Sequence, residues 1–422
     1  MKPLKWIVFY LAVAALIVLG GNALVFLSSR HPDAKQSLVS AVSAPKFQPP
    51  PPPAPVKTPE WNTYHGNNAL TGIADASFPD TLEVLWRIKA GAPVRETPVV
   101  HDGHVFYATA RGDVVAMDLA GKQVWAKEFF TGEKVKDEPV RERIDAPLAC
   151  FDKLVLFGTS EGHFIALDTA TGDERWRVQL MGPIRGTANY LAGNPNRIYI
   201  IEQPTGVLHC IDPETGKVLW KSEGIERCDG SPSVSADAVT FGSCAAAIHV
   251  FDPVTGKLLR NIKIDGDSQV AGGVAQDKGL VFSGCRSGKV LQVDVKEGKI
   301  LWANEQSESE VYSTPAVNDT WVVAASDDGN IYGIDRVDGK GKWKFDTKGS
   351  PTSAVITGDK VVVAADGELF LLRLADGTKA WSLKISDEIS APAVAGDMIL
   401  VGSEDGSVVA LGAPKTREPE TP

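Results

Sequence analysis

The sequence predicts an all-β fold, an eight-bladed β-propeller of four-stranded antiparallel blades, from three observations. Tryptophans recur between residues 81 and 412 at intervals of 39, 51, 44, 82, 41 and 38 residues. Short apolar runs within each interval are separated by Asn-Asp and Asp-Gly turns. A unit of about 40 residues cannot bury both of its faces alone, so neighbouring units must pack on one another. The tryptophans are Trp86, Trp125, Trp176, Trp220, Trp302, Trp343 and Trp381.

One repeat illustrates the four strands expected in each blade. Apolar or alternating runs occupy residues 314–317, 321–325, 330–335 and 341–345, with Asn, Asp and Gly between them. These turn residues accept the positive φ that tight hairpins require. We therefore expect an antiparallel meander, and its radial repetition gives a propeller whose edges are short and protected.

The number of strands predicts eight blades and the way in which the ring closes. The interval of 82 residues is two periods, because Arg260 follows Gly256 at the spacing by which Trp220 follows Gly216. Eight innermost strands begin at pairs of small residues or proline: Thr97-Pro98, Ala146-Pro147, Gly186-Thr187, Ser231-Pro232, Gly272-Gly273, Thr314-Pro315, Pro351-Thr352 and Ala391-Pro392. The strand around Trp86 precedes all of them, and the last unit ends at Leu411 without an outermost strand. The Trp86 strand should therefore complete the last blade.

The repeated segment Asp168-x-x-x-Gly172-x-x-x-Trp176, and its counterparts ending at Trp220 and Trp343, resemble the tryptophan-docking motif of the quinoprotein dehydrogenase-like (PQQ-repeat) propellers. The resemblance covers residues 61–412 and includes a similar lead-in, Trp61-x-x-Tyr64-x-Gly66. It implies that each indole packs on the Gly turn of a neighbouring blade while its N–H meets a carbonyl.

Three positions depart from that motif. Arg260 stands at a Trp position, Arg373 stands at an Asp position, and the first motif is one residue short, as Asp118-x-x-Gly121. We expect these departures to affect individual docking contacts and to leave the ring intact.

The chain before the ring predicts export and membrane attachment. Residues 6–27 carry no charge and follow Lys2 and Lys5, and 22 residues are enough to span a hydrocarbon core of roughly 30 Å. We interpret residues 1–27 as a signal anchor, with a cleaved signal peptide near Gly21-x-Ala23 as the alternative. Residues 28–60 form a Pro-rich linker, residues 61–412 the propeller and residues 413–422 a polar tail.

The charge balance argues against nucleic acid as a partner. Residues 1–60 contain six Lys and Arg against two Asp and Glu, which leaves 37 basic and 51 acidic residues for the rest of the chain. Phosphate binding needs a basic stripe, and this domain is acidic.

Two of the five cysteines predict a disulfide. Cys228 and Cys244 lie at equal distances from the turn at Ala236, so we expect them to be cross-strand neighbours that can pair in an oxidising compartment. Cys285 is the rival partner, at the equivalent position of the next blade. Cys150 and Cys210 are interpreted as small core residues, and unpaired thiols remain the alternative for all.

No catalytic motif is apparent. The sequence lacks Cys-x-x-Cys-His, a P-loop and a Gly-x-Ser-x-Gly elbow. His101 and His104 could hold a metal, but solvated loop histidines are the favoured interpretation. The resemblance raises pyrroloquinoline quinone, which quinoprotein dehydrogenases hold at the axis with calcium; no residue of that site can be placed in this chain, so we expect no cofactor.

The resemblance therefore favours the non-enzymatic, BamB-like members of the family. It implies a membrane-anchored, exported and monomeric propeller that docks other envelope proteins on the periplasmic side. A PQQ-dependent dehydrogenase with calcium is one alternative, and recognition of a glycan or small polar ligand at the channel mouth is another. A form secreted to the periplasm is the alternative location.

One face of the ring is favoured for partner binding. Strand direction places on one side the loops that enter the innermost strands and the turns between second and third strands. The candidate residues there are Arg95, Arg143, Arg185, Arg227, Asp229 and Tyr312. The longest interval between tryptophans contains an insert, residues 128–143, on the same side, and this insert carries both basic and acidic residues. We interpret it as a solvated loop or as a charged rim that sets the register of a partner.

Overall fold

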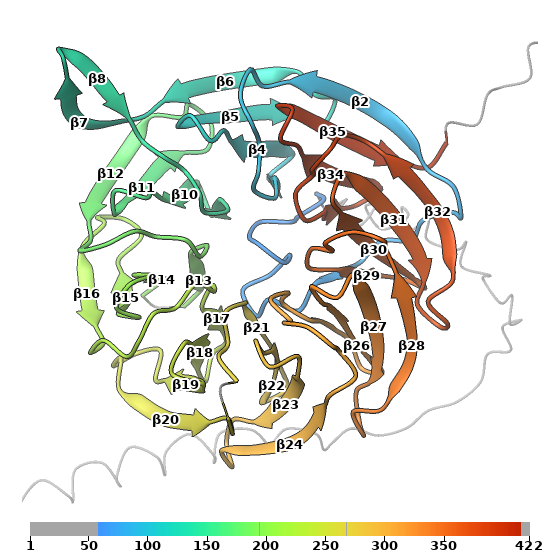
Figure 1. Ribbon diagram of the computed structural model, residues 1–422. Coiled ribbons are helices and arrows are strands. Elements are labelled where there is room, and N and C mark those ends of the chain that lie inside the picture. The colour runs from blue at the N-terminus through green and yellow to red at the C-terminus, as the bar shows by residue number, and fades with distance from the viewer. Residues whose placement is uncertain (1–57, 194, 267, 415–422) are drawn as a thin grey trace, which may run out of the picture. The chain divides into compact units, whose positions relative to one another are not determined.

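A computed structural model describes residues 58–414 of the chain except residues 194 and 267, and within them it forms a closed ring of eight β-sheets (Figure 1). The eight-bladed propeller predicted from the sequence is confirmed. The predicted segment 1–27, the predicted linker 28–60 except residues 58–60, and most of the polar tail lie outside the described residues. No described helix is both long and apolar enough to cross a bilayer.

Each blade is a four-stranded antiparallel meander whose first strand lies nearest the axis. Blade 1 contains β3 (Val99–His101), β4 (His104–Ala108), β5 (Asp113–Asp118) and β6 (Gln123–Glu128). Blade 2 contains β9 (Ala149–Phe151), β10 (Leu154–Gly158), β11 (His163–Asp168) and β12 (Glu174–Gln179). Blade 3 contains β13 (Asn189–Leu191), β14 (Arg197–Ile201), β15 (Leu208–Ile211) and β16 (Val218–Lys221). Blade 4 contains β17 (Ser233–Val234), β18 (Val239–Ser243), β19 (Ala247–Phe251) and β20 (Leu258–Lys263).

The second half of the ring repeats this pattern. Blade 5 contains β21 (Val274–Asp277), β22 (Leu280–Gly284), β23 (Val290–Asp294) and β24 (Lys299–Asn304). Blade 6 contains β25 (Ala316–Val317), β26 (Trp321–Ala325), β27 (Asn330–Asp335) and β28 (Gly341–Asp346). Blade 7 contains β29 (Val355–Thr357), β30 (Lys360–Ala365), β31 (Glu368–Arg373) and β32 (Lys379–Lys384), with β1 (Ile73–Ala74) added in parallel to β29. Blade 8 contains β33 (Ala393–Ala395), β34 (Met398–Gly402), β35 (Ser407–Gly412) and β2 (Glu83–Lys89).

The ring closes as the sequence predicts. β2 pairs antiparallel with β35, and Trp86 lies opposite Ala410. Blade 8 therefore takes its outermost strand from the start of the chain and its other three from the end. This pairing removes the open edge that a linear array of sheets would leave.

The core of the protein lies between neighbouring blades. One apolar cluster joins Phe106 and Trp125 of blade 1 to Phe157 and Ile165 of blade 2, and equivalent clusters fill the following seams. Successive side chains of a strand point to opposite faces of its sheet. In the second and third strands of each blade, one set of side chains therefore packs against the preceding blade and the other set against the next. Each blade is thus buried on both faces.

Six of the seven tryptophans pack on the glycine turn of the next blade, as the family motif implies, although the Trp220 Nε1 has no hydrogen-bond partner in the described part of the chain. The Trp125 ring covers Gly172 so closely that a β-carbon there would lie 2.7 Å from it, and its Nε1 donates to the Thr169 carbonyl at 2.9 Å. The first motif, although one residue short, makes the same contact, because Trp86 packs on Gly121. The motif that carries Arg373 also receives an indole, that of Trp343. Of the three departures, only Arg260 changes the contact between two blades.

The lead-in segment closes one end of the axis, where it crosses the centre of Figure 1 in blue. Its backbone carbonyls accept hydrogen bonds from the innermost strands of successive blades: Asn62 from Cys150, Asn68 from Val234, Ala69 from Gln276, Thr71 from Val317 and Gly72 from Ile356. These bonds satisfy inward-facing N–H groups of strands that have no further strand beside them. The segment thereby ties the blades together at their narrowest point.

Candidate functional site at the mouth of the central channel

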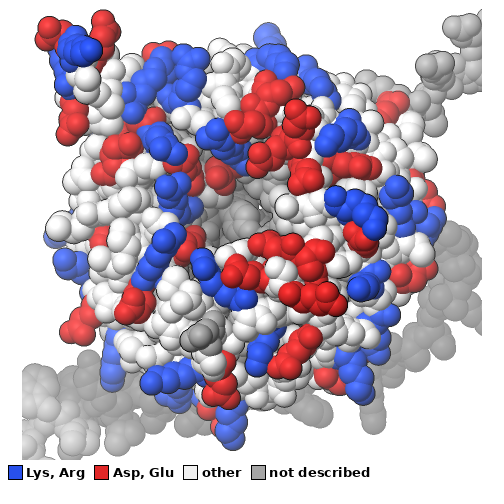
Figure 2. All heavy atoms as spheres, in the orientation of Figure 1, with Lys and Arg blue, Asp and Glu red and all other residues white. Residues whose placement is uncertain are grey.

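The other end of the axis is an open mouth ringed by charged side chains (Figure 2). The loops that enter the innermost strands of blades 1 to 4 carry Arg95, Arg143, Arg185 and Arg227 at equivalent places. All four side chains are exposed, by 49, 61, 38 and 58 % respectively. The structure therefore places the four predicted arginines on one face.

Each of these arginines has a carboxylate partner. Arg95 makes a two-pronged contact with Glu404 of blade 8, with Nε 2.7 Å from Oε2. Arg143 and Arg185 share Asp145, at 3.2 and 3.1 Å. Arg227 contacts Asp229 at 3.0 Å. Because exposed pairs of this kind contribute little to folding, the arginines remain available to a partner.

The mouth itself is a cavity of about 200 Å³ that brings three predicted residues together, Arg185, Asp229 and Tyr312. Arg95, Arg143 and Arg227 do not line it and lie on the surrounding rim. Tyr312 is 36 % exposed, and the Arg286 guanidinium lies 5.1 Å from the centre of its ring. Tyr64 of the lead-in and Glu96 complete the polar lining.

Three glycines explain how the wall of the mouth is built. A β-carbon on Gly186 would lie 2.6 Å from the Gly230 carbonyl oxygen, one on Gly230 2.4 Å from that of Gly272, and one on Gly272 2.0 Å from that of Tyr312. Neighbouring backbones therefore approach more closely than any side chain allows. The wall of blades 3 to 5 is consequently backbone, with few side chains projecting into the channel.

Glu96 is the residue of the mouth that sequence reasoning missed. It follows Arg95 directly and is half-buried. Burial, followed by the negative charge of Asp145, raises the pKa of Glu96 to about 7, although Arg185 and Arg95 oppose the shift. Its charge therefore changes near neutral pH. The packing of blade 2 beside blade 1 brings the Asp145 carboxylate close enough to act on Glu96.

Acidic side chains gather on the part of this face formed by blades 6 to 8, which the sequence analysis did not single out. A shallow cavity of about 310 Å³ is lined by Asp366, Asp387 and Glu388. Burial and then the neighbouring carboxylates Glu310 and Asp328 raise the pKa of Asp327. Figure 2 shows Asp and Glu in two groups beside the central hollow. Four arginines, each with a carboxylate partner, thus lie over blades 1 to 4, and carboxylates gather over blades 6 to 8.

The inserted segment forms a hairpin and is not an irregular loop. Strands β7 (Phe130–Val135) and β8 (Glu138–Arg141) pair and project from the ring at the upper left of Figure 1. Its base is fixed by Arg141, which contacts Asp113 at 2.7 Å and Glu128 at 2.6 Å. Next to it the buried Glu142 carboxylate lies 2.6 Å from His163 and 3.1 Å from Arg177. The base is anchored, while the tip is free to meet a partner.

All five cysteines are free thiols in the structure, so the predicted disulfide between Cys228 and Cys244 is not formed in it. The Cys228 thiol instead donates to the Gly242 carbonyl at 3.0 Å. Burial raises the pKa of Cys228 to about 12, which keeps the nucleophilic thiolate scarce. Pairing in the oxidised protein stays a prediction.

The alternative metal site at His101 and His104 is not assembled. The two ring nitrogens of His101 contact Glu60 at 2.8 Å and the Asp152 carbonyl at 2.7 Å, so neither is left for a metal. His104 contacts the Asp102 carbonyl. Within the described residues no group of three His, Cys, Asp or Glu side chains is placed to hold an ion.

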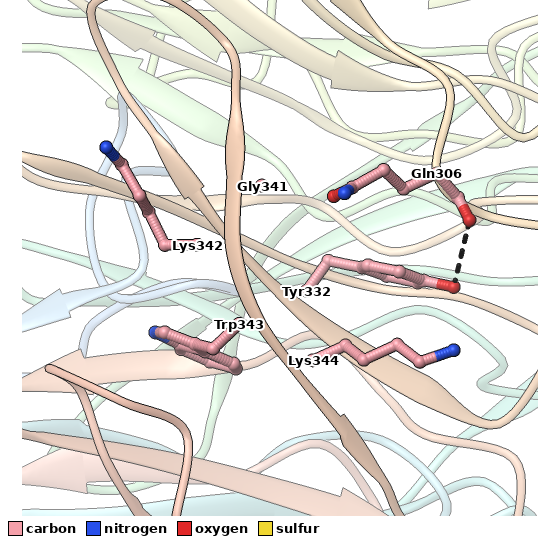
Figure 3. A pocket seen from close by; sticks show the side chains of 6 residues that line it. All are labelled: Gln306, Tyr332, Gly341, Lys342, Trp343 and Lys344. Carbon is pink, nitrogen blue, oxygen red and sulfur yellow. Dashed lines mark hydrogen bonds between the residues drawn. The ribbon is translucent and has the colours of Figure 1, made fainter.

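A second cavity lies between blades 5 and 6, away from the mouth (Figure 3). It measures about 350 Å³, and Gln306, Tyr332 and Trp343 line it together with Lys342 and Lys344. The Tyr332 hydroxyl donates to the Gln306 carbonyl at 3.4 Å, and also to Asp328. The mouth, which brings together Arg185, Asp229 and Tyr312, is the better candidate site.

The repeats, the indole docking and the closure of blade 8 define this protein as a PQQ-repeat propeller. The sequence matches the family described as outer membrane protein assembly factor BamB over residues 76–257 and 205–419, and the chain belongs to that family. The BamB of Burkholderia pseudomallei is 28 % identical over 311 residues, which cover 67 % of this chain and 74 % of that protein.

Two solved structures share the fold. BamB from Moraxella catarrhalis superposes with a TM-score of 0.65 at 19 % identity, covering 80 % of this chain and 99 % of that one. The quinohemoprotein alcohol dehydrogenase from Comamonas testosteroni superposes with a TM-score of 0.67 at 17 % identity. The match covers 86 % of this chain and 82 % of that one. The fold is therefore common to enzymes and to assembly factors, and the residues of the site must distinguish them.

The described residues do not fit a quinone held with calcium. The mouth measures about 200 Å³, below the usual range of about 300–1,000 Å³ for cofactor pockets. Its lining includes tyrosines but no tryptophan, and its carboxylates Glu96 and Asp229 are not joined by a third acidic group. Calcium takes six to eight oxygen ligands, which this set does not supply.

Proposed function

We propose that this protein is a non-catalytic scaffold of the bacterial cell envelope that docks other envelope proteins on the face around the channel mouth. One observation carries the proposal: membership of the BamB family spans almost the whole ring, residues 76–419. Relatives in that family bear the name of an outer membrane assembly factor. The propeller acts on the periplasmic side as a monomer, without a cofactor and without binding nucleic acid.

The charge of the face supports this role. Exposed arginines lie on blades 1 to 4 and carboxylates gather on blades 6 to 8, on different sides of one hollow. A partner with an acidic and a basic segment can then bind in one orientation, because the reverse orientation opposes like charges. The β7–β8 hairpin extends the same face outward and adds contacts for that partner.

We further propose that residues 6–27 hold the propeller at the membrane, with residues 28–60 as a spacer. A Pro-rich spacer extends by about 3.1 Å per residue, so the ring can meet partners at a distance from the bilayer. A cleaved signal, and hence a ring free in the periplasm, is the alternative that fractionation decides.

The test is site-directed photocrosslinking in intact cells. A photoreactive residue at Tyr312 should give adducts with envelope proteins that mass spectrometry identifies. The same residue at Val337, which is 81 % exposed in a turn on the opposite face, should give none. Adducts from Val337 alone would contradict the assignment of the face. Quinone released from the purified protein would favour the dehydrogenase instead.

Charge reversal measures the energetic contribution of the rim. Arg95→Glu with Arg227→Glu is the better pair, since Arg143 and Arg185 share a largely buried Asp145 whose side chain is 10 % exposed. The pair should weaken association at least about tenfold and leave the Tm nearly unchanged. Asp338→Asn with Asp376→Asn on the opposite face is the matched control. Equal loss from both pairs would remove the basis for the proposed face.

A further inference from the structure

The seam between blades 4 and 5 is open where the other seams are filled by an indole. At the docking position of blade 4, Arg260 replaces tryptophan. Its side chain passes 3.6 Å from a β-carbon built on Gly298, whereas docked indoles lie within 3 Å of the equivalent glycines. The Arg260 Nη2 donates to the Lys296 carbonyl at 3.3 Å, one residue beyond the position whose carbonyl accepts the indole N–H in other blades.

The cross-strand row of blade 4 differs from that of blade 5 at its inner position as well as at its outer one. In blade 5 the row is Phe282, Gln292 and Trp302, and the two rings lie 6.3 Å apart. In blade 4 it is Thr240, Val250 and Arg260. Relative to blade 5, the row of blade 4 that faces blade 5 thus lacks two aromatic rings, and its Arg260 is the one departure from tryptophan at the outer position among the eight described blades.

The result is a cavity of about 730 Å³ on the side opposite the mouth, within the size range of small-molecule pockets. It runs from Ala69 of the lead-in to Lys296 at the outer rim. Apolar side chains, Ala238, Val250 and Val295, form its walls. At the inner end the Gln276 amide bonds Ser235 and Thr240, at 2.8 and 3.1 Å, so these polar groups satisfy one another.

The charges of the cavity divide into neutralised and available groups. Asp277 contacts Arg336 at 2.6 Å, and Lys278 contacts Asp319. Among the described residues no carboxylate lies within ion-pair distance of Arg260 or Lys296, which meet at the outer rim. Asp237 lies at the opposite, inner end. The outer rim therefore offers two cations beside an apolar space.

We infer that this seam is a binding site for a small anionic molecule with an apolar, aromatic-sized body. The body occupies the space of the missing rings, between Val250 and Val295, and the anionic group meets Arg260 and Lys296. The site is independent of the proposed docking role, because it opens on the other face and uses none of the mouth residues.

The test uses two fluorescent probes that share one aromatic body, anilinonaphthalene sulfonate and the uncharged phenylnaphthylamine. The full-length protein should bind the sulfonate at one site. Arg260→Trp restores the residue found at this position in the other seven blades, so it should fill the seam, keep the fold and weaken binding of both probes at least about tenfold. Unchanged binding to Arg260→Trp would overturn the inference.

Arg260→Ala removes one charge of the site without filling the cavity. It also replaces Arg260→Trp as the test if that variant is unstable. It should weaken binding of the sulfonate several-fold and leave binding of the uncharged probe unchanged, since the cavity remains. Arg175→Ala is the matched control, an arginine on the outer strand of blade 2, where Trp176 is docked. An equal effect of both alanine variants, or no single-site binding by the parent protein, would refute the assignment.

Discussion

Replacement of one docked tryptophan tests what holds the blades together. Trp176 is 9 % exposed, its Nε1 donates to the Pro213 carbonyl at 2.8 Å, and its ring covers Gly216. Trp176→Ala removes this burial and leaves a cavity, which costs about 3–5 kcal/mol in comparable cores. Arg260→Ala, at the same position of blade 4, removes an exposed side chain and should cost no more than about 0.5 kcal/mol.

The difference is measurable as a change in Tm. Unfolding entropy of about 2.1 cal/mol/K per residue, over a ring of about 340 residues, gives about 0.7 kcal/mol/K. Trp176→Ala should therefore lower the Tm by about 4–7 °C in scanning calorimetry, against less than about 1 °C for Arg260→Ala. Equal shifts for the two variants would refute the claim that indole docking, and not merely the sheets, stabilises the seams.

Three further predictions concern closure, pH and location. Deletion of residues 81–90 removes β2 and exposes the edge of β35, so the ring should associate in size-exclusion chromatography; a monomer with unchanged Tm would contradict closure by this strand. Glu96 has a folded-state pKa of about 7, above its ordinary 4.5, so stability should fall as pH rises between these values. In urea titrations Glu96→Gln should reduce the loss between pH 5 and 8 by about 1 kcal/mol, since water in the mouth screens the charge; an unreduced loss would refute this role. An anchored protein should stay with membranes after high-salt and carbonate washing, and a soluble form starting near Leu24 would instead establish cleavage.

Among the features predicted from sequence, the repeats were the most informative. The spacing of Gly and Trp predicted the blades, and the position of Trp86 before the first innermost strand predicted closure on β35. These features are periodic along the chain, and each arises from contacts within one unit or with its neighbour. Strand direction is likewise the same in every unit, so the sequence also predicted that the arginines of the rim lie on one side of the ring.

Tertiary structure alone decided the features that join distant parts of the chain. Burial and then Asp145 of the neighbouring blade raise the pKa of Glu96. Arg95 pairs with Glu404, 309 positions away, because the ring closes. The sequence marked Arg260 as a departure, but only the structure shows that Thr240, Val250 and Arg260 stand in one cross-strand row beside the cavity. The periodicity of the sequence determined the propeller and which of its loops share a face, whereas side-chain packing across the seams determined where that propeller is hollow.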